Sequence, residues 1–155
     1  MQTDAGLYCP AGDFYIDPSR KVERAVVTHG HADHAYYGMG LYICAEPCAP
    51  VLRRRLGQAI RLHTMPYGVA TTINGVEITF FPAGHVLGSA QVRLRYRGET
   101  WGVTGDFKVE PDPTCAPFEP ILCDVFVTET TFGLPVYEWA EQSLTFADIN
   151  RWWAV

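Results

Sequence analysis

Short apolar runs, separated by glycine, proline or polar residues, recur along the whole 155-residue chain. Residues 25–28 and 41–45 are β-branched or apolar and predict buried strands. Residues 90–96 alternate between apolar and polar side chains, which predicts a half-buried antiparallel strand. Asn74-Gly75 favours a tight hairpin turn between two further strands. The whole pattern predicts about ten strands, two of them within residues 7–17 and the others at 25–28, 41–45, 62–67, 69–73, 76–81, 90–96, 101–104 and 121–127.

Two segments have helical rather than strand-like patterns. Residues 46–56, with Pro47 in the first turn and Gly57 just past the end, predict one helix. Its Arg53–Arg55 run is interpreted as a solvated helix end that complements the helix dipole, with phosphate contact as the alternative. Strands outnumber helices, so the predicted fold class is α+β.

Residues 145–155 predict a second, amphipathic helix near the end of the chain. Thr145 and Asp148 have the spacing of a capping-box-like pair, which predicts that the helix begins at Thr145. Residues 110–120 are rich in proline and predict a loop.

Composition and charge narrow the classes of protein that need considering. A hydrophobic content of 48% suffices for a packed core, so disorder is excluded. The net charge of −5 gives no overall basic surface, so binding of nucleic acid would need a local patch and bound metal. Five cysteines without a C-x-x-C pair favour reduced thiols and a cytoplasmic location. Cys44 and Cys48 form a C-x₃-C pair and are interpreted as buried free thiols, with zinc binding as the alternative. We expect no membrane segment.

The run from His29 to His34 has the form H-x-H-x-D-H and directly follows the strand at residues 25–28. It holds three of the five histidines of the chain, which disfavours a plain polar loop. Imidazole nitrogen and carboxylate oxygen are ligands of zinc, manganese and iron. His29 and His31 alternate as strand-end residues do, whereas Asp33 and His34 diverge. The interpretation is therefore two metal ions that share this loop.

Other ligand-type side chains also stand where predicted strands end. His85, Asp106 and Glu129 each follow such a strand. Because neighbouring strand ends can lie along one edge of a sheet, we expect these side chains to converge on the histidine loop. His63 lacks neighbours of this kind and is interpreted as structural or exposed. The flanking hydroxyl side chains are candidates for hydrogen bonds that support the ligands: Thr28, Ser89 and Thr104.

With these residues in place, the chain resembles the metallo-β-lactamase superfamily. Three motifs and their order along the chain support the resemblance: H-x-H-x-D-H at 29–34, a glycine-flanked histidine at 85 and Gly-Asp at 105–106. Two further stretches, Pro82-Ala-Gly-His-Val-Leu-Gly-Ser-Ala90 and Glu129-Thr-Thr-Phe-Gly133, are similar to the β-CASP nucleases, which process RNA 3′ ends or trim DNA ends. The similarity is nearest to the bacterial ligase-associated DNA exonucleases in residues 7–17, 104–112 and 131–137.

The resemblance implies an αββα sandwich with mixed or antiparallel sheets and flanking helices. The resemblance also leads us to expect that the 155 residues are the N-terminal half of that fold. A β-CASP domain and the C-terminal part of the fold, which would supply the last metal ligand and a general-acid histidine, are expected to be absent from this chain. The apolar face of the last predicted helix is then expected to be uncovered.

The resemblance also implies roles for individual residues and two divalent metal ions, zinc first, with manganese or iron as alternatives. The implied ligands are His29, His31 and His85 for the first ion, Asp33 and His34 for the second, and Asp106 as the bridge between them. Asp33 is also a catalytic candidate, because its carboxylate can accept a hydrogen bond from the attacking water. Glu129 matches an acidic residue that orients the general-acid histidine.

These roles imply a metal-dependent phosphodiester hydrolase, specifically a DNA exonuclease in DNA repair or end processing. The implied partners are nucleic acid, DNA rather than RNA, and a DNA ligase and a helicase of the same repair pathway. One alternative is another metallo-hydrolase of the same fold, such as an RNA-processing nuclease, a thioesterase or a lactam hydrolase. A second alternative is a non-catalytic scaffold subunit, although all six implied ligand positions are filled here.

Overall fold

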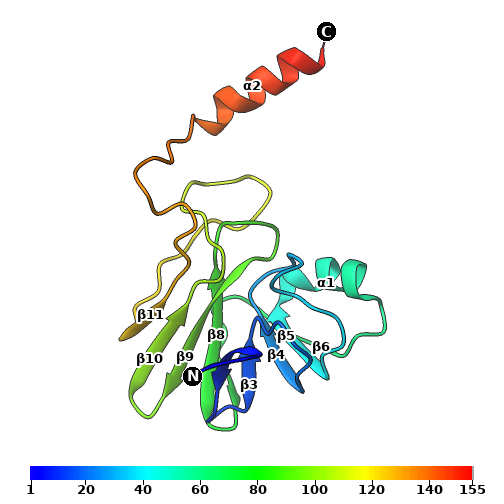
Figure 1. The fold of residues 1–155 in the computed structure, drawn as a ribbon, viewed down its shortest axis with the longest axis vertical. Helices are drawn as coiled ribbons and strands as arrows, with labels where there is room; N and C mark the ends of the chain where they lie inside the picture. Colours follow the sequence, from blue (N-terminus) through cyan, green and yellow to red (C-terminus); the bar gives the residue numbers. More distant parts are fainter. Residues whose placement is uncertain (155) are drawn as a thin grey trace.

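The computed structural model describes residues 1–154, and its strands form two sheets that pack face to face (Figure 1). The first sheet consists, in this order, of β1 (Gln2–Thr3), β2 (Gly6–Cys9), β3 (Phe14–Ile16), β4 (Arg24–Val27), β5 (Leu41–Ala45) and β6 (Leu62–Met65). The second sheet has the order β11 (Val125–Val127), β10 (Glu99–Val103), β9 (Ala90–Tyr96), β8 (Val76–Pro82) and β7 (Thr71–Ile73). The predicted α+β class is confirmed.

The polarity of the strands brings several strand ends to one edge. In the first sheet, β3, β4, β5 and β6 run parallel to one another. In the second sheet, β8 and β10 are both antiparallel to β9, and β11 is parallel to β10. The chain therefore leaves β8, β10 and β11 at the same edge. The two sheets are joined there, because the Ala90 amide at the start of β9 donates to the Thr28 carbonyl just after β4 at 2.8 Å.

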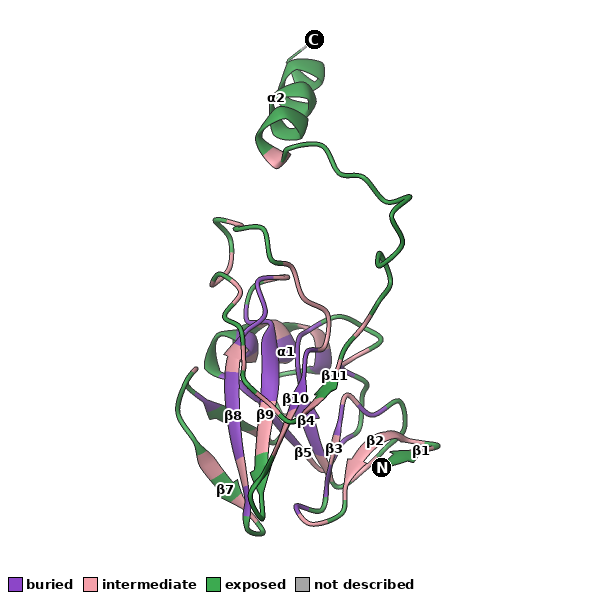
Figure 2. Ribbon diagram, turned by 90° about the vertical axis from the view of Figure 1, so that its left-hand side faces the viewer, coloured by how far each residue is buried: buried purple, intermediate pink, exposed green. Residues whose placement is uncertain are grey.

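Two apolar clusters hold these layers together. The larger one lies between the sheets and includes Phe14 and Val26 from the first sheet and Ile78 and Phe80 from the second. The smaller one lies between the first sheet and the helix α1 (Ala49–Leu56), and contains Tyr42, Cys44, Cys48 and Leu52. Figure 2 shows the buried residues concentrated in the strands of both sheets and under α1.

The predicted helix at residues 46–56 is confirmed, with a tighter first turn than expected. The 3₁₀ turn η1 (Glu46–Cys48) precedes α1, which has proline in its first turn and ends before Gly57. Cys44 and Cys48 are buried and free, as predicted. A hydrogen bond between the two thiols, together with burial, raises the pKa of Cys44.

The second helix, α2 (Gln142–Trp153), extends away from the two sheets (Figure 1). The prediction that it begins at Thr145 was wrong. The helix starts at Gln142, and Thr145 is an interior residue whose hydroxyl lies 3.5 Å from the Glu141 carbonyl. Asp148 pairs with Arg151 rather than with Thr145, at 3.0 Å. The large apolar residues of α2 are exposed, and Figure 2 colours nearly the whole helix as exposed. Val155, the last residue of the predicted helix, lies outside the described residues.

The predicted buried strand at residues 121–127 was too long. Only Val125–Val127 pair with β10, as an edge strand, and Phe126 remains 54% exposed. The strand begins late because Asp124 ends the preceding loop with two hydrogen bonds to Thr100, one through its amide and one through its carboxylate.

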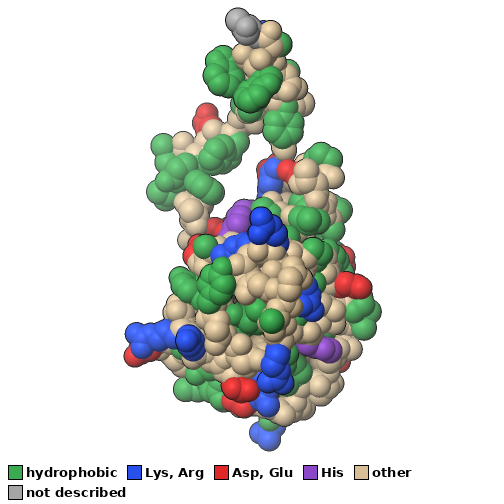
Figure 3. Space-filling model, turned by 90° about the vertical axis from the view of Figure 1, so that its right-hand side faces the viewer, with side chains coloured by type: hydrophobic (Ala, Val, Ile, Leu, Met, Phe, Trp, Pro, Cys, Tyr) green, Lys and Arg blue, Asp and Glu red, His purple; other side chains and the backbone are tan. Residues whose placement is uncertain are grey.

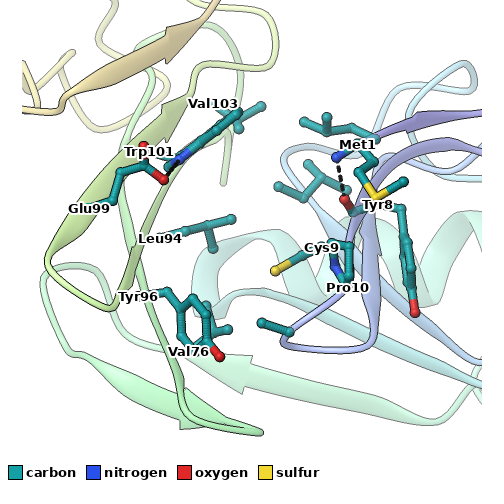
Figure 4. A pocket seen from close by; sticks show the side chains of 13 residues that line it. Met1, Tyr8, Cys9, Pro10, Val76, Leu94, Tyr96, Glu99, Trp101 and Val103 are labelled. Carbon is teal, nitrogen blue, oxygen red and sulfur yellow. Dashed lines mark hydrogen bonds between the residues drawn. The ribbon is translucent and has the colours of Figure 1, made fainter.

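An apolar cavity of about 300 Å³ remains between the sheets near the N-terminus (Figure 4). Cys9 and Leu94 point into it from opposite sheets. The Met1 ammonium group beside it donates to the Tyr8 carbonyl at 2.7 Å. None of the ligand-type residues that converge at the sheet edge lines this cavity. Within residues 1–154 the structure has no helix that combines the length and the apolar character needed to cross a bilayer.

Candidate metal centre

Three loops bring imidazole and carboxylate groups together at the common sheet edge. Each of His29, His31, His85 and Asp106 offers one ligand atom, and these four atoms all lie within 4.8 Å of one another. His29 and His31 come from the loop after β4, His85 from the loop after β8, and Asp106 from the loop after β10. The convergence expected from the strand-end pattern is thus present in the structure for these four residues.

The spacing of these donors fits a divalent metal ion. In a tetrahedral site with bonds of about 2.0 Å, neighbouring ligand atoms lie about 3.3 Å apart. His85 Nε2 lies 3.4 Å from His31 Nδ1 and 3.7 Å from Asp106 Oδ2. His29 Nε2 also lies 3.7 Å from Asp106 Oδ2. These donor distances are slightly longer than those of a closed site, so a small contraction would suffice to bind an ion.

The environment of His29 gives an independent indication of a ligand. Its side chain is fully buried, and its Nε2 has no hydrogen-bond partner among the described residues. Burial and, to a smaller degree, the neighbouring histidines lower the pKa of His29 to about 2. A neutral imidazole with a buried, unpaired nitrogen is costly unless that nitrogen binds something. A metal ion at the centre of the cluster would satisfy it.

A carboxylate that no motif in the sequence marks as functional orients two of the histidines. Asp17, in the turn between β3 and β4, lies 2.6 Å from the Thr28 hydroxyl and 2.8 Å from His34 Nδ1. The Thr28 hydroxyl donates to Asp17, so its oxygen is free to accept from His29 Nδ1 at 3.1 Å. From this network we infer that both imidazoles carry their proton on Nδ1, which leaves Nε2 bare.

Asp106 stands between the four-residue group and the remaining predicted ligands. Its Oδ2 faces His29 and His85, whereas its Oδ1 lies 3.3 Å from His34 Nε2. Asp33 lies farther out, with a side chain 74% exposed and Oδ2 3.8 Å from His34 Nε2. The structure therefore gathers one compact donor group and, across Asp106, a looser second group of Asp33 and His34.

The turn that carries His85 is shaped by close packing. Ser89 Oγ accepts hydrogen bonds from the amides of His85 and Val86, at 3.1 and 3.2 Å. Gly88 has φ +77°, and a side chain there would overlap the main chain of Cys48. The His85 turn is thus seated directly on the 3₁₀ turn before α1. Burial lowers the pKa of His85, with only partial compensation from Asp106, which favours the neutral ligand form.

Arg55 at the end of α1 holds the histidine loop from the outside. Its guanidinium donates to the carbonyls of Gly30 at 2.6 Å, His31 at 3.2 Å and Ala35 at 3.5 Å. The interpretation of the arginine run as a solvated helix end therefore holds for the exposed Arg54 but was wrong for Arg55. Nothing in the sequence pattern separates the two, because the difference depends on where the histidine loop folds back.

The loops after β10 and β11 complete the surroundings of Asp106. Thr104, buried directly after β10, donates to the Gly105 carbonyl at 2.7 Å. The Phe107 amide donates to Glu129 Oε1 at 3.3 Å, which ties the two loops together. Burial raises the pKa of Glu129, but hydrogen bonds from Thr131 and Phe107 outweigh that effect and lower the pKa overall. Glu129 thus lies beside the centre as a carboxylate.

His63 lies apart from the centre, as predicted. It is exposed on β6 and does not belong to the group of converging donors. Figure 3 accordingly shows histidine side chains at the surface in two separate places.

No protein-family model matches the chain. A probable DNA ligase of Opitutus terrae is 31% identical over 147 residues, which are 93% of this chain and 14% of that protein. The endoribonuclease ysh1 of Aspergillus fumigatus is 40% identical over 76 residues, or 47% of this chain and 9% of that protein. An RNase J-like protein of Methanocaldococcus jannaschii is 24% identical over 156 residues, or 86% of this chain and 37% of that protein.

The chain spans no more than 37% of the length of any of these three relatives. Two of the three carry the names of nucleases, and the similarity to the third extends over almost all of this chain. Together with the converging histidines at the sheet edge, these similarities establish the relationship that the sequence motifs suggested. The chain is related to the β-CASP nucleases of the metallo-β-lactamase superfamily.

Proposed function

We propose that this chain carries the metal centre of a nuclease that hydrolyses phosphodiester bonds, specifically a DNA exonuclease in DNA repair or end processing. The observation that carries the proposal is the buried His29 Nε2, which lacks a partner among the described residues and faces the other donors of the centre. A scaffold protein would have no need to maintain such an unsatisfied atom. The nuclease relatives supply the reaction class.

Support for DNA as the substrate comes from the relative named as a probable DNA ligase, whose similarity covers 93% of this chain. A DNA ligase and a helicase of the same repair pathway are the partners that we propose. The five free cysteines agree with action in the reducing cytoplasm.

The proposed ligands of the first ion are His29, His31, His85 and Asp106, and those of the second are Asp33 and His34, with Asp106 shared. When bound, divalent metal ions supply Lewis acidity, which makes water a stronger nucleophile at neutral pH and neutralises charge that develops on the phosphate oxygens. Zinc is the ion that we propose first, since imidazole-rich sites suit it, with manganese or iron as alternatives.

The protein's own groups position the reactants. The exposed carboxylate of Asp33 can accept a hydrogen bond from the attacking water and hold it in line with the phosphate. Asp17 keeps His34 turned toward Asp106. Glu129, anchored by the Phe107 amide, is the group that we propose to orient a general acid. A positioned acid typically contributes about 10²–10⁴-fold to the rate.

We also propose that residues 1–155 form the N-terminal part of a metallo-β-lactamase domain, with the β-CASP domain and the C-terminal part of the fold lying outside them. The supporting observation is that α2 extends into solvent, with Phe146, Ile149, Trp152 and Trp153 between 48% and 81% exposed. In the complete domain this face would pack against the remaining elements.

A nuclease assay with three substrates tests the proposal. End-labelled single-stranded DNA, the matching RNA and a chromogenic β-lactam are incubated with the zinc- or manganese-loaded complete protein, which contains the parts proposed to lie outside residues 1–155. We expect cleavage of DNA that EDTA abolishes and that is absent in His29→Ala and His85→Ala. His63→Ala, the matched control, should cleave like the wild type. Cleavage of RNA in preference to DNA would overturn the choice of substrate, and turnover of the β-lactam alone would overturn the nuclease proposal.

A further inference from the structure

A second cavity, of about 260 Å³, adjoins the metal centre on the side of α1. Its walls come from the histidine loop, from α1 and from the turn after β8, and they include His31, Ala32, Val51, Arg55, Val86 and Leu87. His31 belongs both to this cavity and to the metal-ligand group. Val86 and Leu87 directly follow His85, whose Nε2 is 3.4 Å from His31 Nδ1. Anything bound in this cavity would therefore lie next to the proposed reaction site.

The chemistry of the lining indicates what the cavity can bind. Ala32, Val51, Val86 and Leu87 present aliphatic groups. Among the described residues, Arg55 is the one cationic side chain that lines the cavity, and it donates to the main-chain carbonyls of the histidine loop. These walls offer few free donors to a phosphate group. An uncharged, flat group with an apolar face suits them better.

The geometry also shows that the apolar wall is held in place. A side chain on Gly30 would lie 2.5 Å from Val51 Cγ1, so the histidine loop and α1 are in close contact here. Leu87 is 51% exposed, although the adjacent Gly88 and Ser89 are buried. A half-exposed leucine on a turn fixed by its neighbours presents an apolar surface to the cavity rather than to the core.

We propose that this cavity receives the nucleobase of a nucleotide adjacent to the scissile phosphate, with Val51 and Leu87 as the residues that contact it. The proposal rests on the proposed function, which supplies the phosphodiester. The volume lies just below the range of about 300–1,000 Å³ that is usual for ligand pockets, so it suits one base rather than several nucleotides. The phosphate would then lie over His31 and His85.

Two chromogenic phosphodiesters test the inference on the metal-loaded complete protein, which contains the parts proposed to lie outside residues 1–155. Thymidine 5′-(p-nitrophenyl) phosphate contains a base, and methyl p-nitrophenyl phosphate does not, while the leaving group is the same. We expect Leu87→Ala to lower the ratio of kcat/KM for the thymidine ester to that for the methyl ester roughly tenfold, as is usual for lost apolar contact in a pocket. Val51→Ala should act in the same direction. Leu122→Ala, at a leucine that is 93% exposed elsewhere, should keep the wild-type ratio.

An unchanged ratio in both Leu87→Ala and Val51→Ala would overturn the inference, even if the wild type hydrolyses both esters and the proposed function stands. If the wild type hydrolyses neither ester, the proposed function fails, and binding of thymidine 5′-monophosphate followed by NMR decides the inference separately. Binding that Leu87→Ala weakens roughly tenfold relative to Leu122→Ala would support a base site. Absent binding, or equal binding in the two variants, would refute it.

Discussion

Asp17 and His34 are separated by 17 positions in the chain, yet Asp17 Oδ2 lies 2.8 Å from His34 Nδ1. The same carboxylate binds the Thr28 amide and hydroxyl, at 2.8 and 2.6 Å. One residue outside the H-x-H-x-D-H motif therefore orients its last histidine directly and its first through Thr28. Burial lowers the pKa of His34, but the hydrogen bond and charge of Asp17 outweigh this and raise it.

We predict that Asp17→Asn weakens zinc binding about 10- to 100-fold, the range usual for loss of a group that orients a metal ligand. An amide NH₂ in place of Oδ2 would donate toward His34 Nδ1 and Thr28 Oγ1, so His34 would have to move its proton to Nε2. That nitrogen would then lack the lone pair that faces the centre. Competition with a chromogenic chelator measures the affinity.

Asp13→Asn is the matched control for that substitution. Asp13 and Asp17 both have a positive φ, of 52° and 43°, but the Asp13 carboxylate binds Arg24 and Tyr8 at the surface rather than a histidine. The Asp13→Asn variant should bind zinc with the same affinity as the wild type. Equal affinities of the Asp17 and Asp13 variants would show that Asp17 has no part in orienting the ligands.

Replacing Arg55 should destabilise the histidine loop. Arg55→Ala removes charged hydrogen bonds to the carbonyls of Gly30, His31 and Ala35, and we expect a loss of about 1–3 kcal/mol in the free energy of unfolding. Arg54→Ala, at the exposed neighbouring position, should stay within about 0.5 kcal/mol of the wild type. Urea denaturation of the metal-free chain measures both. A loss of the same size in both variants would mean that the arginine run acts only through its charge.

Gly88 and Gly98 allow steric contact to be separated from backbone strain. Both have positive φ, +77° and +86°, so alanine at either position should cost about 1–2 kcal/mol for the left-handed conformation. Only at Gly88 would the new side chain overlap a neighbouring main chain, that of Cys48. We expect Gly88→Ala to be destabilised by at least about 1 kcal/mol more and to lose zinc affinity. Thermal unfolding measures the stability of the two variants, and zinc titration measures their affinity. If Gly88→Ala and Gly98→Ala were equal in both, the His85 turn would not be packed tightly against the Cys48 main chain.

Much of this architecture follows from local sequence patterns. The apolar runs locate most of the strands, since burial between two sheets requires them. The ligand-type residues after β4, β8 and β10 converge because those strand ends meet at one edge. The sequence can predict that these residues converge, but it cannot predict the distances between their ligand atoms.

The features that the sequence did not indicate depend on contacts between distant segments. Asp17 precedes a proline and resembles an ordinary turn residue, and its pairing with His34 exists only after the sheet has formed. Gln91 is one of the polar residues that alternate with apolar ones in residues 90–96, and this pattern predicts an exposed side chain. It is nevertheless fully buried, because its amide donates to the carbonyls of Pro82 and Glu119, where the proline-rich loop covers the second sheet.

The most direct test of the account is a zinc titration of the purified chain in a chelator-buffered solution, with bound metal counted by mass spectrometry. The structure predicts a single tightly held ion, because His29, His31, His85 and Asp106 form one compact donor group, and a weaker second ion at the more open Asp33 and His34. Tight binding should disappear in His29→Ala and persist in His63→Ala. Tight zinc binding that survives in His29→Ala, or no tight binding by the wild type, would contradict the assignment of this cluster as the metal centre.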